Sequence, residues 1–369
     1  MTKTNHPAPG GVARKQPPTA TAIPPTPGSN APVPFGDDRN AFLDMLADRL
    51  PPREQRARDR LRKVKACYVE SGRDAYVADQ LESFLAEALA RDQDTLNDAR
   101  IMIMTAPSGM GKSAAIHHAL RNSPTLQPIS TPLGVIDPVV SVNLSGPSTL
   151  KILGERILKQ AGYVFRKKID QGDLWEMIPE QLALRRVLVV HIDEIQHLIR
   201  DTEKQTERRQ LANAIKDVVN YPDWPIAFIL TGMPETINLA ARDEQIERRS
   251  RYILFQSLTM PDERGLVVDI VRRKCAAGEI DPGEAILGKM PERIAHAANY
   301  RYGRCCEIVL AALHMAFRKD AAVLTVDHFA QAYQRHSHAI GYDDHNPFLV
   351  DDFLRLAQGT FLIEPETLA

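Results

Sequence analysis

The chain has 369 residues, with 46 Lys and Arg against 47 Asp and Glu, so its formal net charge is −1 at pH 7. This balance excludes a protein that coats nucleic acid by bulk positive charge, but it allows a local basic surface. The length predicts about two to three folding units. Four cysteines form no C-x-x-C pair, and no apolar run reaches the roughly 18 to 20 residues that cross a bilayer. We therefore expect a reduced, cytoplasmic protein without a zinc site or a membrane span.

Residues 1–40 predict a disordered leader, since they are rich in Pro, Ala, Thr, Gly and Asn and include nine of the 26 prolines. A partner-binding tail is the alternative. Residues 41–98 predict an N-terminal helical extension, with one helix ending before Pro51 and another over 76–90. The basic stretch 53–65 between them is either a solvated helix face or a contact for phosphate backbone.

Short apolar runs alternate with helical stretches over 99–258, which predicts an α/β domain with a mainly parallel sheet. The expected strands are 101–104, 139–144, 187–192, 226–230 and 252–255, and a helix is expected over 204–220. Helices expected at 262–277, 284–298, 303–318 and 326–338 predict a small all-helical domain over 259–342. Residues 343–369 carry four aspartates around Phe348, Leu349 and Phe353, which indicates a tail or a docking segment.

The first expected strand leads into Ala106–Ser113, which matches the P-loop pattern G-x-x-x-x-G-K-[ST] except that Ala106 replaces the first glycine. Lys112 is expected to reach the β- and γ-phosphates of ATP and Ser113 to ligate Mg²⁺. The following helix would direct its positive end toward the phosphates. The predicted nucleotide-binding residues of this loop are Pro107, Ser108, Gly109, Met110, Gly111, Lys112, Ser113 and Ala114.

A second apolar strand ends in Asp193 and Glu194. Asp193 is expected in the Mg²⁺ shell and Glu194 as the group that orients or deprotonates the attacking water. An acidic helix cap is the alternative. Thr231, after a third strand, is a candidate to contact the γ-phosphate or the water, and Asn143 a candidate to contact Glu194; strand-end turns and caps are the alternatives. Histidines that lie close in the sequence, such as His191 and His197, have no carboxylate or cysteine at the spacing of metal ligands, so we expect them to be structural.

Three stretches together resemble the AAA+ ATPases and, more narrowly, the TniB/TnsC family of transposition regulators. They are the P-loop, the segment His191–His197 and the segment Thr231–Arg249, in which Asp243, Gln245, Ile246 and Arg249 match the family pattern. The resemblance covers about residues 40 to 340. It implies a three-layer αβα core with a parallel sheet, followed by a helical lid.

The resemblance also implies a homo-oligomer, a ring or helical filament, with ATP sites between subunits. An arginine from the neighbouring subunit would contact the γ-phosphate. Arg249 is the first candidate, with Arg248 and Arg251 as rivals and a solvated basic turn as the alternative. Arg304 is expected to reach the nucleotide of its own subunit, with Arg301 as its rival.

Members of the family contact duplex DNA, and the matching region contains Ser148, Thr149 and Lys151, followed by Lys159, Arg166 and Lys167. Hydroxyl and lysine contacts to phosphates would give sequence-independent binding; surface helix residues are the alternative. We expect an ATPase that regulates DNA transposition by assembling on double-stranded target DNA and recruiting a transposase and a TniQ-like target-selection protein. The alternatives are a DNA scaffold with negligible turnover, and a replication initiator or helicase loader. Against the latter, too few residues follow position 340 for the winged-helix module common in initiators.

Overall fold

The computed structural model describes residues 39–90, 100–132, 134–199, 205–240, 244–336 and 343–359. The chain divides into a first unit, residues 1–50, and a second unit, residues 51–369. In the first unit the helix α1 (Arg39–Ala47) is described. It ends several residues ahead of Pro51. The rest of the predicted leader lies outside the described residues.

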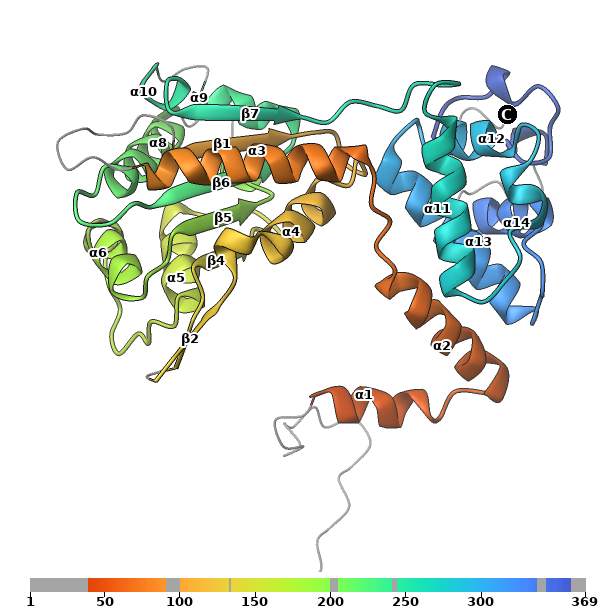
Figure 1. Ribbon diagram of the computed structural model, residues 1–369, viewed down its shortest axis with the longest axis horizontal. Helices are drawn as coiled ribbons and strands as arrows, with labels where there is room; N and C mark the ends of the chain where they lie inside the picture. The colour runs from red at the N-terminus through yellow and green to blue at the C-terminus, as the bar shows by residue number, and fades with distance from the viewer. Residues whose placement is uncertain are drawn as a thin grey trace, which may run out of the picture. The chain divides into compact units, whose positions relative to one another are not determined.

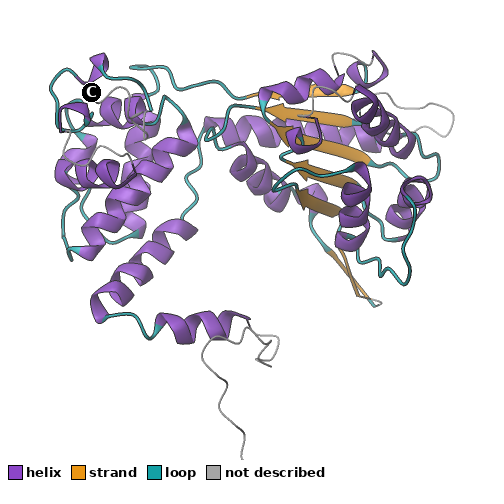
Figure 2. Ribbon diagram, turned by 180° about the vertical axis from the view of Figure 1, so that it is seen from behind, coloured by secondary structure: helices purple, strands orange, loops and turns teal. Residues whose placement is uncertain are grey.

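Five parallel strands form the central sheet of the second unit (Figures 1 and 2). They are β1 (Ile101–Thr105), β4 (Val139–Asn143), β5 (Val189–Asp193), β6 (Ala227–Gly232) and β7 (Ser250–Leu254), in the order β4-β5-β6-β1-β7. All five predicted strands are confirmed, with shifted ends; β7, for example, begins at Ser250 rather than Tyr252. Because every strand is parallel, their carboxyl ends meet at one edge of the sheet.

Side chains alternate between the two faces of the sheet, and helices cover both. Ile101 and Ile103 of β1 pack against α5 (Leu150–Gln160), α6 (Gln171–Leu184) and α8 (Gln205–Val219). Met102 and Met104 pack on the other face, against α3 (Gly72–Leu89) and α4 (Lys112–Asn122). Apolar strands buried on both faces are typical of parallel sheets. The predicted αβα core is therefore confirmed.

The helical lid consists of α11 (Arg264–Ala277), α12 (Met290–Ala297), α13 (Tyr302–Arg318) and α14 (Val326–His336) around one apolar core. The predicted helix over 284–298 is wrong in its first part, where a short 3₁₀ turn, Gly283–Ile286, stands instead. The α-helix begins only at Met290. This start leaves Pro291 in the first turn, where a missing N–H is tolerated, rather than in a helix interior.

The predicted N-terminal extension contributes to both cores. Helix α2 (Pro52–Ala66) packs in the lid, where Ala57 and Val64 are buried, whereas α3 packs on the sheet. One connector, residues 67–71, therefore joins a helix of the lid to a helix of the core.

Several cations of the basic stretch 53–65 bind the carboxyl ends of lid helices. Arg60 donates to the carbonyl oxygens of Gly278 and Glu279 at 2.9 and 3.0 Å, and its guanidinium lies 4.2 Å from the ring centre of Phe317. Lys63 pairs with the carboxylate of Glu279 at 2.6 Å. Helix carboxyl ends leave carbonyl groups unpaired and favour cations. Arg60 and Lys63 thus bind another part of the same chain. Neither a solvated helix face nor a contact for phosphate backbone, the two interpretations of the sequence, includes this role.

The acidic segment 343–359 docks on the lid, as one of its two interpretations predicts. Phe348 is buried against Phe329 and Tyr333, with ring centres 5.4 and 6.0 Å apart. The buried Asn346 amide donates to the carbonyl oxygen of Ala330 at 3.0 Å. Residues 360–369 lie outside the described residues.

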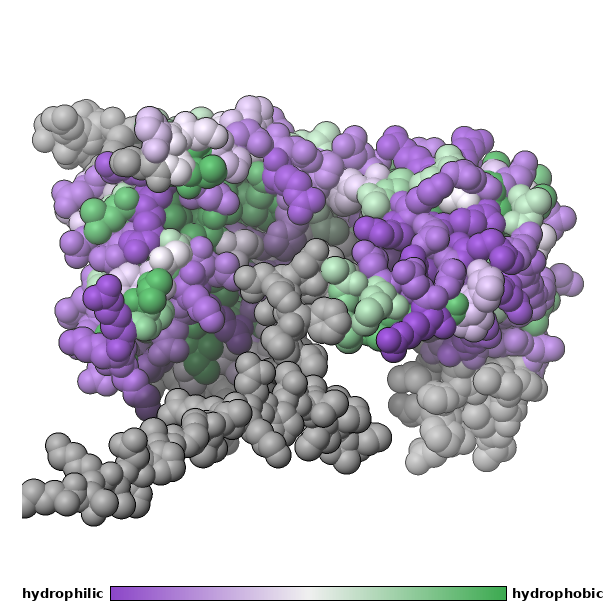
Figure 3. Space-filling model, turned by 90° about the horizontal axis from the view of Figure 1, so that it is seen from below, coloured by the Kyte–Doolittle hydropathy of each residue, from purple (hydrophilic) through white to green (hydrophobic). Residues whose placement is uncertain are grey.

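The remaining elements are short. They are the 3₁₀ turns Pro124–Leu126, Pro234–Thr236, Asp343–His345 and Phe353–Arg355, the hairpin β2 (Ile129–Thr131) and β3 (Gly134–Ile136), and the helices α7 (Gln196–Ile199), α9 (Ile237–Ala240) and α10 (Glu244–Glu247). Across the described part of the chain, no helix combines the length and the apolar character of a membrane span. On the face drawn in Figure 3, hydrophilic surface predominates and hydrophobic residues form small separate patches. Such scattered apolar residues are normal on a protein surface.

Candidate nucleotide-binding site

The loop between β1 and α4 has the backbone of an anion cradle. Gly109 and Gly111 have φ angles of +80° and +89°, in the left-handed region that favours glycine. Gly111 stands directly before α4, whose first residues are Lys112 and Ser113. The loop therefore leads into a helix N-terminus, where backbone N–H groups and the helix dipole favour a phosphate.

Lys112 and Glu194 meet at the carboxyl edge of the sheet. Lys112 is buried, and its Nζ lies 3.4 Å from Oε1 of Glu194, just beyond β5. Glu194 has a φ of +59°, which is uncommon for a residue other than glycine. Ligands of open parallel sheets bind at this edge, and backbone strain of this kind gathers at functional sites.

Asp193 is buried, and its Oδ1 accepts two hydrogen bonds. The backbone N–H of Glu194 donates to it at 2.9 Å and the hydroxyl of Thr231 at 2.6 Å. Thr231 is itself fully buried, so the structure places its hydroxyl on Asp193. Burial lowers the pKa of the neighbouring His191 to about 4.

Gln196 is the second side-chain partner of Glu194 in the described part of the chain. Its Nε2 donates to Oε2 of Glu194, and its Oε1 accepts from the backbone N–H of Met233 at 3.1 Å. Asn143, which the sequence suggested as a partner of Glu194, lies exposed at the end of β4. Sequence reasoning missed Gln196, whose place two residues after Glu194 could have indicated it. That its side chain is buried is known only from the structure.

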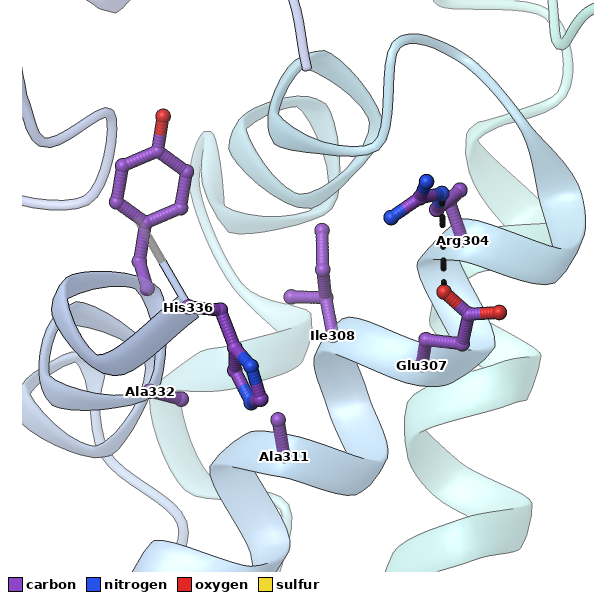
Figure 4. Close-up of a pocket in the computed structure, with 7 residues that line it drawn as sticks. Arg304, Glu307, Ile308, Ala311, Ala332 and His336 are labelled. Carbon is purple, nitrogen blue, oxygen red and sulfur yellow. Dashed lines mark ion pairs between the residues drawn. The ribbon is translucent and has the colours of Figure 1, made fainter. Parts of the chain in front are cut away.

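Both candidate arginines of the lid lie against the P-loop. Nη1 of Arg301 donates to the carbonyl oxygen of Ser108 at 3.0 Å. The backbone N–H of Arg304 donates to the carbonyl oxygen of Gly109, also at 3.0 Å. The Arg304 side chain pairs with Glu307, Nε to Oε2, at 3.7 Å (Figure 4). It stands at one end of a cavity of about 350 Å³ between α13 and α14. The geometry thus leaves both arginines as candidates.

A larger cavity, of about 650 Å³, opens beside the P-loop. Its walls are the P-loop, the connector with the adjoining ends of α2 and α3, Glu194, Phe255 and the start of α13. Tyr68 of the connector stacks on His118 with ring centres 4.1 Å apart, and Tyr302 donates to the carbonyl oxygen of Val69 at 2.8 Å. The volume suits a small-molecule ligand. No motif in the sequence marked this connector, because its place beside the P-loop depends on how α2 and α3 pack.

The donor set fits ATP with Mg²⁺. The glycine cradle and Lys112 suit phosphates, while Ser113 and Asp193 offer the oxygen ligands that Mg²⁺ prefers. In the described residues no group of three or more His, Cys, Asp or Glu residues could hold a metal by itself. A nucleotide-bound Mg²⁺ needs no such group, since it takes one or two carboxylates together with substrate phosphates and water.

The arginines proposed for a neighbouring site lie at the opposite edge of the sheet. The first residue of β7, Ser250, pairs with the first residue of β1, Ile101. The N–H of Ile101 donates to the carbonyl oxygen of Arg249. Because β1 separates this edge from the P-loop by about 13 Å, these arginines lie away from the site of their own chain. Arg251 pairs with Glu87 of α3, and Arg249 donates to Asn220 Oδ1 at 2.5 Å. Arg248 is exposed; Asp243 and the side chain of Gln245 are outside the described residues.

The predicted DNA-contacting residues divide into separate groups. Thr149 caps α5, accepting from the N–H of Ile152 at 3.3 Å, with Ser148 and Lys151 beside it. Lys159 lies in the last turn of α5, about 12 Å along the helix from Lys151. Arg166 and Lys167 are exposed in the connection to α6.

A five-stranded parallel sheet with a P-loop after β1, an Asp-Glu pair at the end of β5 and a helical lid define a P-loop ATPase of the AAA+ class. The chain belongs to the TniB family, since the family described as "Bacterial TniB protein" matches residues 73–261. No curated protein sequence matches the chain.

Solved structures share the fold. Cdc6p from Pyrobaculum aerophilum aligns with a TM-score of 0.55 at 12% identity, covering 74% of this chain and 70% of that chain. ORC2 of Aeropyrum pernix, in its ADPNP–ADP complexes, aligns with a TM-score of 0.53 at 13% identity, covering 76% of this chain and 74% of that chain. ORC1 of Aeropyrum pernix, in complex with DNA, aligns with a TM-score of 0.52 at 17% identity, covering 75% of this chain and 68% of that chain. At such low identities this likeness concerns the fold alone.

Proposed function

We propose that the chain binds and hydrolyses ATP with Mg²⁺ and uses this cycle to regulate DNA transposition. The observation that carries the ATPase proposal is the approach of Lys112 to Glu194 at the carboxyl edge of the sheet. Residues 107–114 would cradle the phosphates, with Lys112 on the β- and γ-phosphates. Ser113 and Asp193 would hold Mg²⁺, which neutralises charge on the phosphates. Glu194 would orient and deprotonate the attacking water.

Substitution of Glu194 by Gln tests this assignment. Gln is nearly isosteric and cannot act as a base, so we expect ATP affinity to be retained while turnover falls by about a hundredfold or more. Phosphate release, with and without duplex DNA, gives the turnover, and a fluorescent ATP analogue gives the affinity. Unchanged turnover would contradict the role of Glu194. No release by the wild-type protein under any condition would favour a binding scaffold.

ATP sites between subunits are the second part of the proposal. The Arg248–Arg251 cluster lies at the sheet edge opposite its own P-loop, so it would serve the site of a neighbouring copy in a ring or filament. Arg249 remains our first choice over Arg248 and Arg251. Arg251 is already paired with Glu87 and Ser83 of its own α3, which reduces its availability to a neighbouring subunit. Arg304, with Arg301 as rival, would contact the nucleotide from the lid.

Membership of the TniB family supports the DNA and transposition parts of the proposal. The chain would bind double-stranded DNA without sequence preference through Ser148, Thr149, Lys151, Lys159, Arg166 and Lys167. It would then recruit a transposase and a TniQ-like protein. The solved ORC1 complex shows this fold with DNA. Electron microscopy with an ATP analogue and duplex DNA would test assembly; no DNA-dependent particles would contradict it.

A replication-initiator or helicase-loader role is the second candidate, because Cdc6p and ORC proteins share the fold. The family match favours transposition over this role. Affinity capture with a purified transposase and with a replicative helicase as alternative partners separates the two.

A further inference from the structure

We propose that His191 is a positioning residue which, through Thr231, fixes the orientation of the Asp193 carboxylate toward the metal ion. This inference rests on the proposed Mg²⁺-ATP site and adds to it a residue outside the P-loop and the Asp193–Glu194 pair. His191 lies within an apolar strand and is fully buried. A polar ring is costly in such a place unless its nitrogens are hydrogen-bonded.

The register of the sheet brings the participating side chains together. Ser141 of β4 and His191 of β5 are direct partners in the parallel ladder. Side chains alternate along a strand, and Val190, Ile192 and Leu230 pack on the α5 side. His191 and Thr231 therefore project from the other face, which α4 covers. His117 of α4 lies edge-on to His191, with ring centres 5.1 Å apart.

The hydrogen bonds of these groups can run in one direction only. The Thr231 hydroxyl has two acceptors in reach, Oδ1 of Asp193 at 2.6 Å and the carbonyl oxygen of Ile192 at 3.3 Å. Neither can donate, so the single hydroxyl proton goes to the nearer one, the carboxylate. The contact of 3.1 Å between Thr231 and Nε2 of His191 then requires Nε2–H as the donor. A neutral imidazole carries one N–H. Its Nδ1 therefore accepts from the Ser141 hydroxyl at 2.7 Å.

This chain of bonds ends on one carboxylate oxygen. Oδ1 of Asp193 accepts from both Thr231 and the N–H of Glu194, which occupies its two lone pairs. Oδ2 is thereby left for a metal ligand bond. Hydrogen bonds behind a ligand commonly orient it in this way, and their loss typically weakens metal affinity by about 10- to 100-fold.

Two amide substitutions separate the contact of His191 with Thr231 from its contact with Ser141. In His191→Gln the amide nitrogen takes the place of Nε2 and can still donate to Thr231. In His191→Asn the amide reaches only the place of Nδ1, so the Ser141 bond is kept and the Thr231 bond is lost. Both variants leave a polar amide in the strand, so each is the matched control for the other.

The readout is Mg²⁺ binding rather than turnover. A fluorescent, non-hydrolysable ATP analogue is titrated with Mg²⁺, and the half-saturating concentration is compared among wild type and both variants. We expect His191→Asn to raise this concentration by about tenfold and His191→Gln to stay near wild type. Affinity for the analogue in EDTA should be equal in all three proteins.

Equal Mg²⁺ affinity in all three proteins would overturn the inference, and so would an equal loss in both variants, because the contact with Thr231 is kept in only one of them. If His191→Asn does not fold, Thr231→Val and Thr231→Ser replace the pair, since only serine keeps the hydroxyl. The valine variant is then expected to lose Mg²⁺ affinity and the serine variant to keep it; equal affinities would overturn the inference. A wild-type protein that binds no Mg²⁺-nucleotide would contradict the proposed function itself, a result distinct from these.

Discussion

Gln196 holds Glu194 from one side while its own oxygen is bound to the backbone of Met233. The Nε2 donor contacts Oε2 of Glu194, and Oε1 accepts at 3.1 Å from the N–H that follows β6. Lys112 holds the other carboxylate oxygen at 3.4 Å. Glu194 is therefore oriented by two groups from different parts of the chain.

Replacement of Gln196 by Ala should lower turnover more than nucleotide affinity. Without the amide donor, Glu194 keeps the Lys112 contact as its one side-chain partner among the described residues and loses its fixed direction toward the water. Misplacement by about 1 Å can lower a rate by about a hundredfold. We expect phosphate release to fall by about tenfold or more, with affinity for a fluorescent ATP analogue near wild type. Gln160→Ala, at the exposed end of α5, is the control; a similar loss in both variants would speak against the orienting role.

Replacement of Gly303 by Ala should push the lid away from the P-loop. A Cβ atom there would lie 2.6 Å from the carbonyl oxygen of Gly109 and 2.9 Å from the amide nitrogen of Gly111. Both are backbone atoms, so the lid or the loop must shift. We expect affinity for the ATP analogue to fall, with a loss of stability of about 1 to 3 kcal/mol.

Gly265→Ala is the matched control for Gly303→Ala. It lies in the lid helix α11, and a Cβ there has no neighbour within 4 Å. An alanine in that helix should leave nucleotide affinity unchanged and stabilise the lid by up to about 1 kcal/mol. Equal nucleotide affinity in the two variants would show that the contact between Gly303 and the P-loop is dispensable for binding.

Replacement of Arg60 by Ala should destabilise the lid without weakening DNA binding. The change removes two hydrogen bonds to the end of α11 and the cation above Phe317. Together these contacts are worth about 1 to 2 kcal/mol. Arg62, two residues away and exposed, provides the control, for which we expect a change within about 0.5 kcal/mol. Chemical unfolding measures stability and fluorescence anisotropy measures DNA affinity; a DNA defect with normal stability in Arg60→Ala would reverse the interpretation.

Mild acid should destabilise the lid. Burial lowers the pKa of His296, His314 and His328, all in lid helices. A histidine whose pKa is lower in the folded state than its unfolded value of about 6.5 binds more protons when unfolded. Stability is therefore fully present above about pH 6.5 and is lost as the pH falls from there toward the folded-state pKa values.

Unfolding midpoints at pH 7.5 and pH 5.5 measure this effect. Substitution of His296 by Gln should reduce the difference between the two midpoints, because Gln does not titrate in this range. His336→Gln, at the exposed end of α14, is the control substitution. A midpoint that does not change between the two pH values would rule the histidines out as a source of acid sensitivity.

Local chemistry in the sequence was enough to predict the elements and to propose the first residues of the candidate site. The P-loop, the Asp193–Glu194 pair and the alternation of strands with helices are properties of neighbouring residues. Each requires a particular backbone conformation, side-chain charge or burial pattern within a few positions. The prediction of a helix over 284–298 was wrong in its first part. It followed the helical spacing of the apolar residues and gave too little weight to Pro291, which is tolerated in the first turn of a helix.

Contacts between distant segments were decided only by the tertiary structure. The sequence placed seven cations over 53–65 but could not show that Arg60 would meet Gly278, 218 residues away. It placed Glu194 after a strand but not Gln196 between it and Met233. It left His191 as a structural histidine, whereas strand register puts Ser141 and Thr231 on its two nitrogens. A hydrogen bond depends on the direction of two side chains, and for residues far apart that direction follows from register and helix packing, which no short pattern encodes.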